Sequence, residues 1–394
     1  MATSPVSAIQ DPSIRFTIKV DGSTIQDTYG VSSIEVQHAI NRISTAEIVL
    51  QGEIDLSSDA FAISDGDDFK PGKKIEITAG YGDSAQTSIF SGNIVRHSVD
   101  INLETGRNLR LYCKHAAVTM TYNRKDAVFA QKQDSAIMQT IIGNYSGLSA
   151  SVDSTTQEHP FVYQRMATDW DFILSRAEFC GFIVTMDGDT LKIGKPDFSG
   201  SAVLRLAVGE SLISFTADIS AENQPTSIEA HAWDQKTQAL LSSTAAEPSL
   251  NSQGSLAPKD LSAMLSQTAL KLNTPVPMSS DELKTWAEGI LLRKRLSALK
   301  GSAKFVGSAL AKTGTLAELA GVGAKFNGDA FITAVTHHIN GPDGWNTTVK
   351  FGMDAGFISQ KPDFSFEEAG GQLPAIHGIQ IGTVKKLSSD PDGA

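Results

Sequence analysis

Short segments of alternating apolar and polar side chains fill the first hundred residues. Residues 14–20 alternate strictly, and Asp21-Gly22 follows them as a turn. Similar segments lie at 34–38, 46–50, 75–79, 87–89, 94–101 and 109–113, with a corner expected at 90–92. Successive side chains of a strand point to opposite faces, so a period of two marks a strand with one buried face. Short strands at this spacing predict a closed β-barrel or a sandwich, which we assign to residues 1–118.

The pattern changes to helical spacing near residue 119. Asp134 or Ser135 can cap a first helix, whose apolar positions are 137, 138, 141 and 142. A second helix is predicted to begin at Thr168 and to end at Cys180-Gly181. Its buried stripe consists of Trp170, Ile173, Leu174 and Ala177. An Asp-Gly turn at 187–188 then joins two short strands, so residues 119–198 are predicted to form a small α+β module.

Alternation returns after residue 199 and predicts a second β-barrel over residues 199–358, with an insertion at 244–304. Residues 244–280 are rich in Ser, Ala, Pro and Thr, which indicates a long loop. Ser279 and Glu282 have the spacing of a capping box and start a helix, on which residues 293–295 (Arg-Lys-Arg) are expected mostly on the solvent side. Strands are expected again at 305, 315–316, 331–335 and 347–351.

Two segments share the order strand, histidine, turn, strand. The first runs from Gly92 through His97 to residue 112, and the second runs from Phe331 through His337 to residue 351. Hairpins of this composition also arise by chance. A true duplication would give each chain two similar β-barrels with the α+β module between them. Three such chains would present a ring with six-fold character, which could dock on a hexameric tube.

Composition argues against several classes of function. The 394 residues carry a net charge of −11, spread along the chain, which disfavours nucleic-acid binding and docking on anionic membranes. No apolar run approaches the roughly 20 residues needed to cross a bilayer. The polar start lacks the features of a signal peptide, so synthesis in the cytoplasm is expected. Cys113 and Cys180 are too few for a disulfide framework and are predicted to be buried.

Several side chains are candidates for chemistry. The adjacent His337 and His338 point to opposite faces of a strand, so they do not start a metal site. The Asp187–Asp189 turn lacks the closing glutamate of a calcium loop, and the acidic loop with Asp59, Asp65, Asp67 and Asp68 is predicted to be solvated. Asp171 and Glu178 share a helix face, but nothing indicates a sugar groove beside them. We therefore predict no catalytic, cofactor-binding or metal-binding residues and no enzymatic activity.

Three motifs, taken together, resemble the VgrG and phage baseplate-hub family, which includes extracellular contractile injection systems. One is the helix from Thr168 to Gly181, where the family typically has S-D-W-x-F-L-x-R-L-A-E-x-x-G; the matching residues are Thr168, Trp170, Phe172, Glu178 and Gly181. Another resembles the closing hairpin of a second barrel, with Gly344, Trp345, Phe351 and Gly352. The last resembles the first strand of an OB-fold neck, with Gly378 and Gly382, in a linker and neck region at 359–394.

The resemblance implies a mainly β fold with two barrels similar to the tube protein, the α+β module and the start of the neck. It implies a structural homotrimer that joins a hexameric inner tube to a puncturing spike. Baseplate proteins and effectors would be further partners, with no nucleic acid and no membrane insertion at rest. Family members ordinarily continue into an OB domain and a β-helical spike, whereas this sequence stops at Ala394, so either the chain is truncated or the spike is separate. The place of work would be a tail-like particle, in one variant released from the cell.

Two other classes of function stay open at this point. One is a peptidoglycan-degrading glycoside hydrolase of a tail baseplate, and the other is a monomeric carbohydrate-binding β-module. Secretion-system spikes, phage hubs and extracellular particles share these motifs, so the sequence does not separate them. For a trimer, the strands at 14–20 and 228–232 are expected to be barrel edges that contact a neighbouring subunit.

Overall fold

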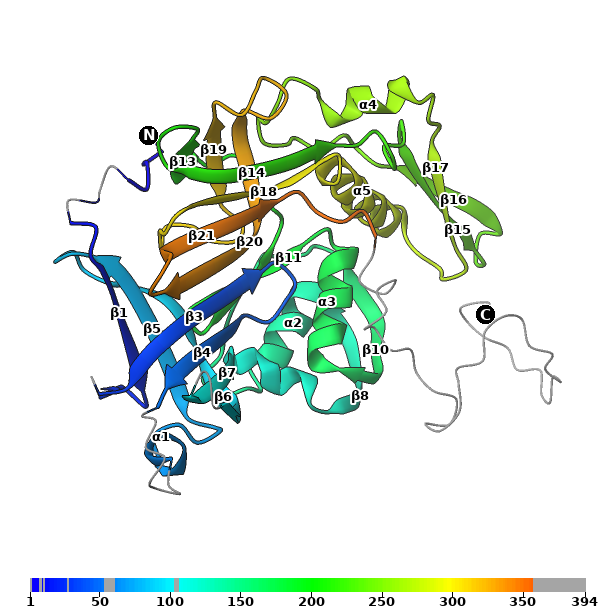
Figure 1. Ribbon diagram of the computed structural model, residues 1–394. Helices are drawn as coiled ribbons and strands as arrows, with labels where there is room; N and C mark the ends of the chain where they lie inside the picture. Colours follow the sequence, from blue (N-terminus) through cyan, green and yellow to red (C-terminus); the bar gives the residue numbers. More distant parts are fainter. Residues whose placement is uncertain are drawn as a thin grey trace.

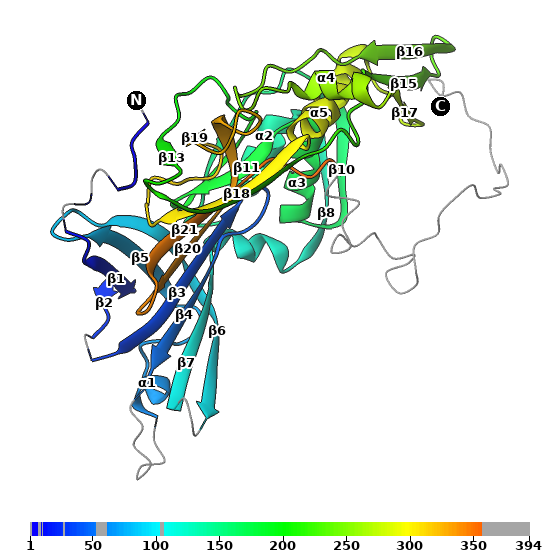
Figure 2. The same ribbon diagram turned by 45° about the horizontal axis from the view of Figure 1, so that its top comes forward.

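The computed structural model describes residues 2–6, 9, 11–26, 28–52, 61–102 and 106–356 (Figures 1 and 2). One sheet of 13 strands runs through the molecule, and three sheets of two, three and three strands stand beside it. The predicted fold class, mainly β with an α+β addition, is confirmed. None of the helices in these residues is long and apolar enough to cross a membrane.

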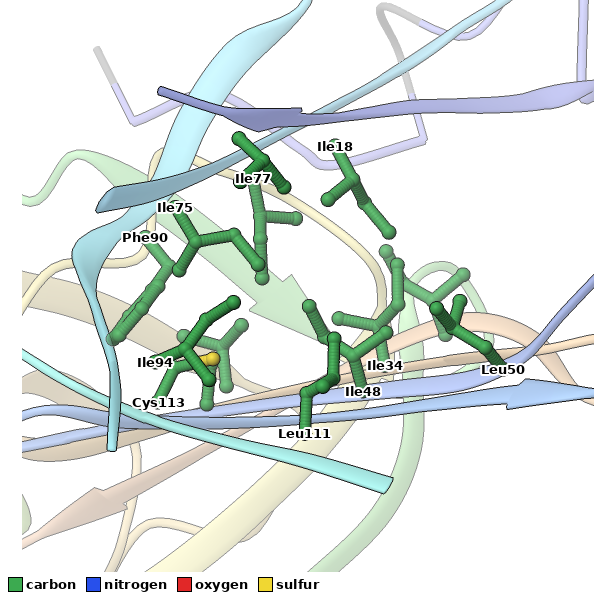
Figure 3. Close-up of a cluster of buried hydrophobic side chains, with 14 of the residues drawn as sticks. Ile18, Ile34, Ile48, Leu50, Ile75, Ile77, Phe90, Ile94, Leu111 and Cys113 are labelled. Carbon is green, nitrogen blue, oxygen red and sulfur yellow. The ribbon is translucent and has the colours of Figure 1, made fainter. Parts of the chain in front are cut away.

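The first β unit, called repeat 1 below, curls around a core of its own. Its elements are β1 (Ile14–Val20), β2 (Ser23–Thr24), β3 (Gly30–Ala39), β4 (Thr45–Gln51), α1 (Ala62–Asp65), β5 (Lys74–Tyr81), β6 (Thr87–Asn102) and β7 (Gly106–Lys114). Figure 3 shows alternate side chains of these strands converging, among them Ile34, Ile48, Ile77 and Leu111, all fully buried. The period of two predicted from the sequence therefore marks the core face of each strand.

The second β unit, called repeat 2 below, is assembled from strands far apart in the chain. Its strands are β13 (Leu204–Ala207), β14 (Leu212–Ile219), β18 (Leu299–Val306), β19 (Leu316–Ala320), β20 (Gly328–Asn340) and β21 (Gly344–Phe351). Their inward side chains form a second core, which includes Leu206, Phe305 and Phe351. Phe351 is stacked on Phe215 at a centroid distance of 6.1 Å.

The two repeats have the same strand order. Repeat 1 runs β3-β4-β7-β6-β5-β1, and repeat 2 runs β14-β18-β21-β20-β19-β13. The equivalent strands also follow one another in the same order along the chain. The last pairs differ in direction, because β1 and β5 are antiparallel whereas β13 and β19 are parallel. The suspected duplication is thus present in the topology.

Equivalent residues can be assigned from the register. Residues 94–113 of the β6–β7 hairpin match residues 332–351 of the β20–β21 hairpin, with the β-bulge after Ile94 matching that after Ile332. Residues 31–37 of β3 likewise match 212–218 of β14, again with a bulge at the same place. This register corrects the alignment expected from the sequence, because His337 corresponds to Val99 and not to His97.

The repeats are joined edge to edge in one continuous sheet. Residues 33–39 of β3 pair antiparallel with residues 334–340 of β20 (Figure 1). Two side chains of repeat 2, Ile339 and Trp345, reach into the core of repeat 1. Trp345 is stacked on Tyr81 at 5.2 Å, and Gly307 leaves the space that its indole occupies. The strand path of repeat 1 therefore does not close on itself but continues into repeat 2.

The α+β module packs beside this sheet. Its elements are the 3-10 helix at Ala116–Thr121, β8 (Arg124–Gln133), α2 (Asp134–Ile142), β9 (Ser149–Val152), β10 (Glu158–Thr168), α3 (Asp169–Phe179), β11 (Ile183–Asp187) and β12 (Thr190–Gly194). The expected cap of α2 is wrong. Residue Gln133 precedes the helix without a side-chain cap, and Asp134 is a buried residue of the first turn with other partners.

Residues 228–296 form a fourth unit with its own core, which contains most of the insertion predicted at 244–304 and is called the insertion below. It holds β15 (Ile228–Asp234), β16 (Ala239–Thr244), α4 (Pro258–Met264), β17 (Leu270–Thr274) and α5 (Ser280–Leu296). Residues 244–280 are therefore more than a loop. The strand expected at 228–232 is not a barrel edge, because β15 is the central strand of the sheet β16-β15-β17. Arg295 is also not on the solvent side but fully buried, where it is paired with Glu247 at 2.6 Å.

The strand expected at 14–20 does lie at a sheet margin. Beyond β1 the sheet order ends with β2, which covers only Lys19 and Val20. The neck region at 359–394, with Gly378 and Gly382, lies outside the described residues. The domain boundaries stay predictions.

We expect Trp345→Ala to lower the free energy of unfolding by about 3–5 kcal/mol, the usual cost of emptying a large buried aromatic site. The indole joins the two repeats and is 4% exposed. Chemical denaturation followed by circular dichroism measures the change. Trp233→Ala is the matched control, because Trp233 is 50% exposed and should cost far less. Equal losses for the two variants would contradict the joining role.

Candidate functional site

The first motif places α3 at the centre of the α+β module. The helix, predicted to begin at Thr168, begins at Asp169, and the side chain of Thr168 caps it by accepting a hydrogen bond from the Asp171 backbone N–H at 3.0 Å. Trp170 and Phe172 are buried in the module core, and Phe172 is stacked on Phe129 at 5.8 Å. The motif therefore orients a helix from which both core and polar side chains project.

A buried carboxylate lies at the start of α3. Asp169 accepts hydrogen bonds from Lys125 (2.6 Å), Tyr145 (2.6 Å) and Gln164 (2.7 Å). Burial alone would raise the pKa of Asp169, but these three donors outweigh it and lower the pKa. The cluster ties α3 to β8, to β10 and to the segment after α2.

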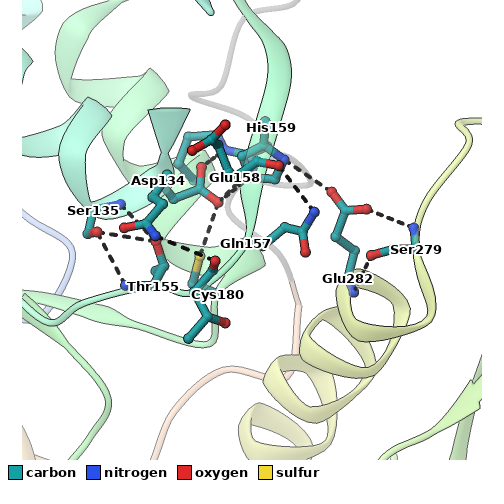
Figure 4. Close-up of polar contacts among 12 residues, drawn as sticks. Asp134, Ser135, Thr155, Gln157, Glu158, His159, Cys180, Ser279 and Glu282 are labelled. Atoms are coloured by element: carbon teal, nitrogen blue, oxygen red, sulfur yellow. Dashed lines mark hydrogen bonds and ion pairs between the residues drawn. The ribbon is translucent and has the colours of Figure 1, made fainter. Parts of the chain in front are cut away.

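A second polar network connects the module with the insertion (Figure 4). Asp134 of α2 accepts hydrogen bonds from Arg176 of α3 (2.5 and 2.9 Å) and from His159 of β10 (2.8 Å). The other ring nitrogen of His159 lies 3.1 Å from Glu282, which also completes the capping box of α5 with Ser279. Four elements therefore meet around two buried side chains, Asp134 and His159.

The charges in this network shift each other's pKa values. Burial alone would raise the pKa of Asp134, but the hydrogen bonds from His159 and Arg176 hold it at about 2. The hydrogen bonds to Asp134 and Glu282 raise the pKa of His159 to about 9. His159 is therefore a cation at neutral pH, between two carboxylates.

The helix crossing of α3 and α5 explains two further motif residues. Glu178 of α3 forms a buried ion pair with Arg293 of α5, and burial lowers the pKa of Arg293 to about 10. One turn away, the backbone of Gly181 approaches that of Gly289 so closely that a Cβ added at Gly289 would lie 3.0 Å from the Cα of Gly181. Gly181 also has a positive φ of 68°. The glutamate and the glycine thus fix how the insertion helix sits on the module.

The second motif closes repeat 2. Gly344 lies at the hairpin turn and has a positive φ of 69°. Gly106, at the equivalent turn of repeat 1, also has a positive φ, of 81°. Phe351 is buried against Gly301, where a Cβ would lie 2.5 Å from its ring. Gly352 has a φ of 79°, and a Cβ there would collide with the Leu299 carbonyl. These residues shape the backbone at the end of the second core.

A cleft of about 830 Å³ lies between α3 and the sheet. Trp170, Asp171 and Leu174 line one side, and β3, β18, β20 and β21 line the other, with the turn at 40–43 between them. Four basic residues reach it: Arg42, Arg293, Lys300 and Lys350. Of these, Arg293 is already bound to Glu178, and Lys300 lies 3.9 Å from Asp354.

The side chains that are candidates for chemistry have other partners. Glu178 is held in its ion pair, away from Asp171, which interacts with the Thr168 hydroxyl at 2.7 Å. His337 is fully buried beside Thr347 (2.9 Å) and His38, and burial lowers its pKa to about 3. Asp187 and Asp189 pair with Lys312 (3.2 Å) and Lys74 (3.0 Å), which ties the module's hairpin to both repeats.

No group of three or more His, Cys, Asp or Glu is placed to hold a metal ion within the part of the chain that the structure describes. Both cysteines are free and buried there, as predicted, and burial raises the pKa of each thiol to about 12.

Sequence reasoning missed the residues that connect the units. Arg176, His159 and Asp134 come from three separate segments, and no local spacing brings them together. Asn41, with a φ of 58°, exchanges hydrogen bonds of 2.8 Å with the Val184 backbone and so links the β3–β4 turn to β11. An asparagine at the tip of a hairpin was the one available signal. All of these contacts position elements relative to one another.

The chain was compared with known protein families, curated sequences and solved structures. The model of the Alg8 N-terminal domain family matches residues 10–341. No curated protein sequence matches the chain.

Three solved structures are similar over most of their length. A 43 kDa tail protein of a Shewanella oneidensis prophage has a TM-score of 0.65 at 10% identity, covering 87% of this chain and 99% of that one. A tail protein from Neisseria meningitidis has a TM-score of 0.63 at 13% identity, and the match covers 87% of this chain and 97% of that one. A type VI secretion component of E. coli has a TM-score of 0.54 at 11% identity, and the match covers 89% of this chain and 80% of that one. That component is itself described as similar to the T4 tail proteins gp27 and gp5. The expected resemblance to tail and hub proteins is confirmed for the fold.

We expect the His159 network to make stability depend on pH. Its raised pKa means that charged His159 stabilises the fold fully below about pH 6.5 and that this contribution is lost as pH rises through about 9. His159→Gln should cost about 1.5–3 kcal/mol at pH 6.5, the range for hydrogen bonds to charged groups. Its melting temperature should also fall less between pH 6.5 and 9.5 than that of the unaltered protein. His231→Gln, on β15, is the control. If the melting temperature of His159→Gln falls between pH 6.5 and 9.5 as much as that of the unaltered protein, His159 is not the group responsible for the pH dependence.

Gly289→Ala tests the helix crossing through the sign of its effect. Helix propensity alone would stabilise α5 by up to about 1 kcal/mol. We expect destabilisation by about 1–3 kcal/mol instead, because the new methyl meets the backbone of Gly181. Thr285→Ala in the same helix should be neutral or slightly stabilising. Thermal unfolding compares the two, and a higher melting temperature for Gly289→Ala would disprove the close approach.

Proposed function

We propose that this chain, which belongs to the Alg8 N-terminal domain family, is a structural hub protein of a contractile injection machine. The proposal starts from its fold, which is that of tail proteins. In this role a trimer of the chain joins the hexameric inner tube to a trimeric spike. Baseplate proteins and effectors are its further partners, and the assembled tail-like particle is its place of work.

The duplication carries this proposal. Each chain holds two β units with the same strand order and equivalent β-bulges, fused through the β3–β20 pairing. A trimer therefore offers six similar units on its tube side while keeping three-fold symmetry on the side of the spike. A symmetry mismatch between a six-fold tube and a three-fold spike calls for such a component.

The nature of the motif residues supports the same role. Glu178, Gly181, Gly344 and Gly352 fix helix crossings and backbone turns. A protein that transmits force between tube and spike needs rigid coupling between its units, and the buried ion pairs and the shared sheet supply it. The tail proteins of similar fold give the setting in which that coupling would be used.

We expect the 394-residue chain to form particles of three 41.9 kDa chains in mass photometry. Electron microscopy of the protein mixed with an inner-tube protein from the same organism should show the trimer capping tube ends. Trp233→Ala, at an exposed site of the insertion, is the control variant and should form the same trimers. A protein that stays monomeric alone and with tube protein, and that never appears at tube ends, would rule out the hub function.

A further inference from the structure

Equivalent strand edges of the two repeats differ in whether a neighbouring strand pairs with them. In repeat 2, residues 334–339 of β20 are paired on one side with β21 and on the other with β3. The equivalent residues of repeat 1, 96–101 of β6, pair with β7 alone, because β5 reaches only as far as Asn93. Among the described residues, no strand fills the position beside 96–101 that β3 fills beside β20.

Burial reflects this difference. His337 and Ile339 on β20 are 2% and 4% exposed, whereas their equivalents Val99 and Ile101 are 41% and 64% exposed. Exposed β-branched side chains beside an unpaired strand edge are a known liability, which proteins manage by covering the edge. Figure 2 shows the β6–β7 hairpin projecting from the body of the sheet.

A strand of matching geometry stands at the opposite end of the sheet. β14 is the equivalent of β3, and it is the terminal strand of the sheet order, paired with β18 alone. Phe215 and Ala217 are only half-buried, although their equivalents Ile34 and Val36 are fully buried under the β20 hairpin. Ile213 on the same strand is exposed. Two strand edges meet at the β3–β20 junction, and within the part of the chain that the structure describes, one equivalent of each is unpaired.

We propose that β14 of one copy pairs with residues 96–101 of β6 in the next copy, in the manner of β3 and β20 within the chain. The register of the internal junction, transferred through the repeat, sets Val99 opposite Ala217, Asp100 opposite Thr216 and Ile101 opposite Phe215. This contact deepens the proposed function and rests on it, since it supplies the trimer's subunit interface.

The transferred register is physically compatible. It sets no like charges opposite each other, and Asp218 lies diagonal to Arg96, within reach of a long side chain. The interface is head-to-tail, because two different edges meet, so it generates a ring when the rotation closes. Every contact between successive repeats is then alike, whether inside a chain or between chains. Both unpaired edges disappear when the ring closes.

Disulfide trapping tests the register in the full-length protein. We would combine Val99→Cys with Ala217→Cys, and separately Asp100→Cys with Thr216→Cys. Adjacent antiparallel pairs alternate between close and wide spacing, so one of the two combinations has the closer geometry. Mild oxidation should give dimers and covalent trimers on non-reducing gels. The control joins Val99→Cys with Thr216→Cys, one residue out of register, which puts the two thiols on opposite faces.

A surface variant tests the contact without cysteines. Ile101→Lys should leave the melting temperature of the monomer unchanged and shift the trimer to monomers at the concentration of the assay. Val128→Lys is the matched control, because Val128 is 60% exposed on β8, which belongs to a different sheet, and should leave the trimer intact.

The outcomes separate the two proposals. A trimer in mass photometry that neither cross-links in register nor dissociates with Ile101→Lys would overturn this interface and leave the hub function standing. Cross-linking only by the out-of-register pair would overturn it as well. A protein that is monomeric under every condition would instead refute the hub function, and this interface with it.

Discussion

The pairing of β3 with β20 is the constraint on which the rest of the molecule depends. Seven residue pairs turn two separate β units into one sheet, and Trp345 and Ile339 carry side chains of one unit into the core of the other. A strand edge in water would expose unpaired backbone groups, so the two edges stabilise each other by being joined. Because a slip of one residue would send His337 and Ile339 to the wrong face, the junction also fixes the relative rotation of the repeats.

The module and the insertion are held against each other by polar contacts. Asp134 and His159 of the module are linked to Glu282 of the insertion through buried or half-buried charges, and Glu178 with Arg293 fixes a helix crossing. Removing one partner of such a pair leaves a buried charge uncompensated, which is why these contacts discriminate strongly against other arrangements. Apolar packing alone would tolerate sliding of α5 on α3, whereas the Gly181–Gly289 contact and the ion pair permit one position.

Local patterns in the sequence predicted what is decided locally. The period-two segments form strands, a helix starts next to Thr168, Ser279 is a cap, and the Asp-Gly turn closes a hairpin. Partners far apart in the chain were beyond such patterns. The burial of Arg295 follows only from Glu247 and Gln224, which come from distant segments. The strand at 228–232 has the same alternation as a barrel strand, and only the position of α5 decides which sheet it joins. The same limit misaligned the two hairpins, since residue type matches His97 to His337 whereas hydrogen-bond register matches Val99.

The two repeats share backbone features and differ in side chains, which is why residue type misaligned them. Side chains at equivalent positions differ in kind, such as Arg107 and Trp345, yet the bulges and the positive-φ glycines Gly106 and Gly344 coincide. Bulges and turns determine where a strand bends and which edge it presents, so they set how one repeat meets the next. Side chains on the two edges are free to diverge as long as one edge is covered within the chain and the other is covered elsewhere. Ile339 is buried because its edge is covered within the chain, whereas the equivalent Ile101, on the other edge, is exposed.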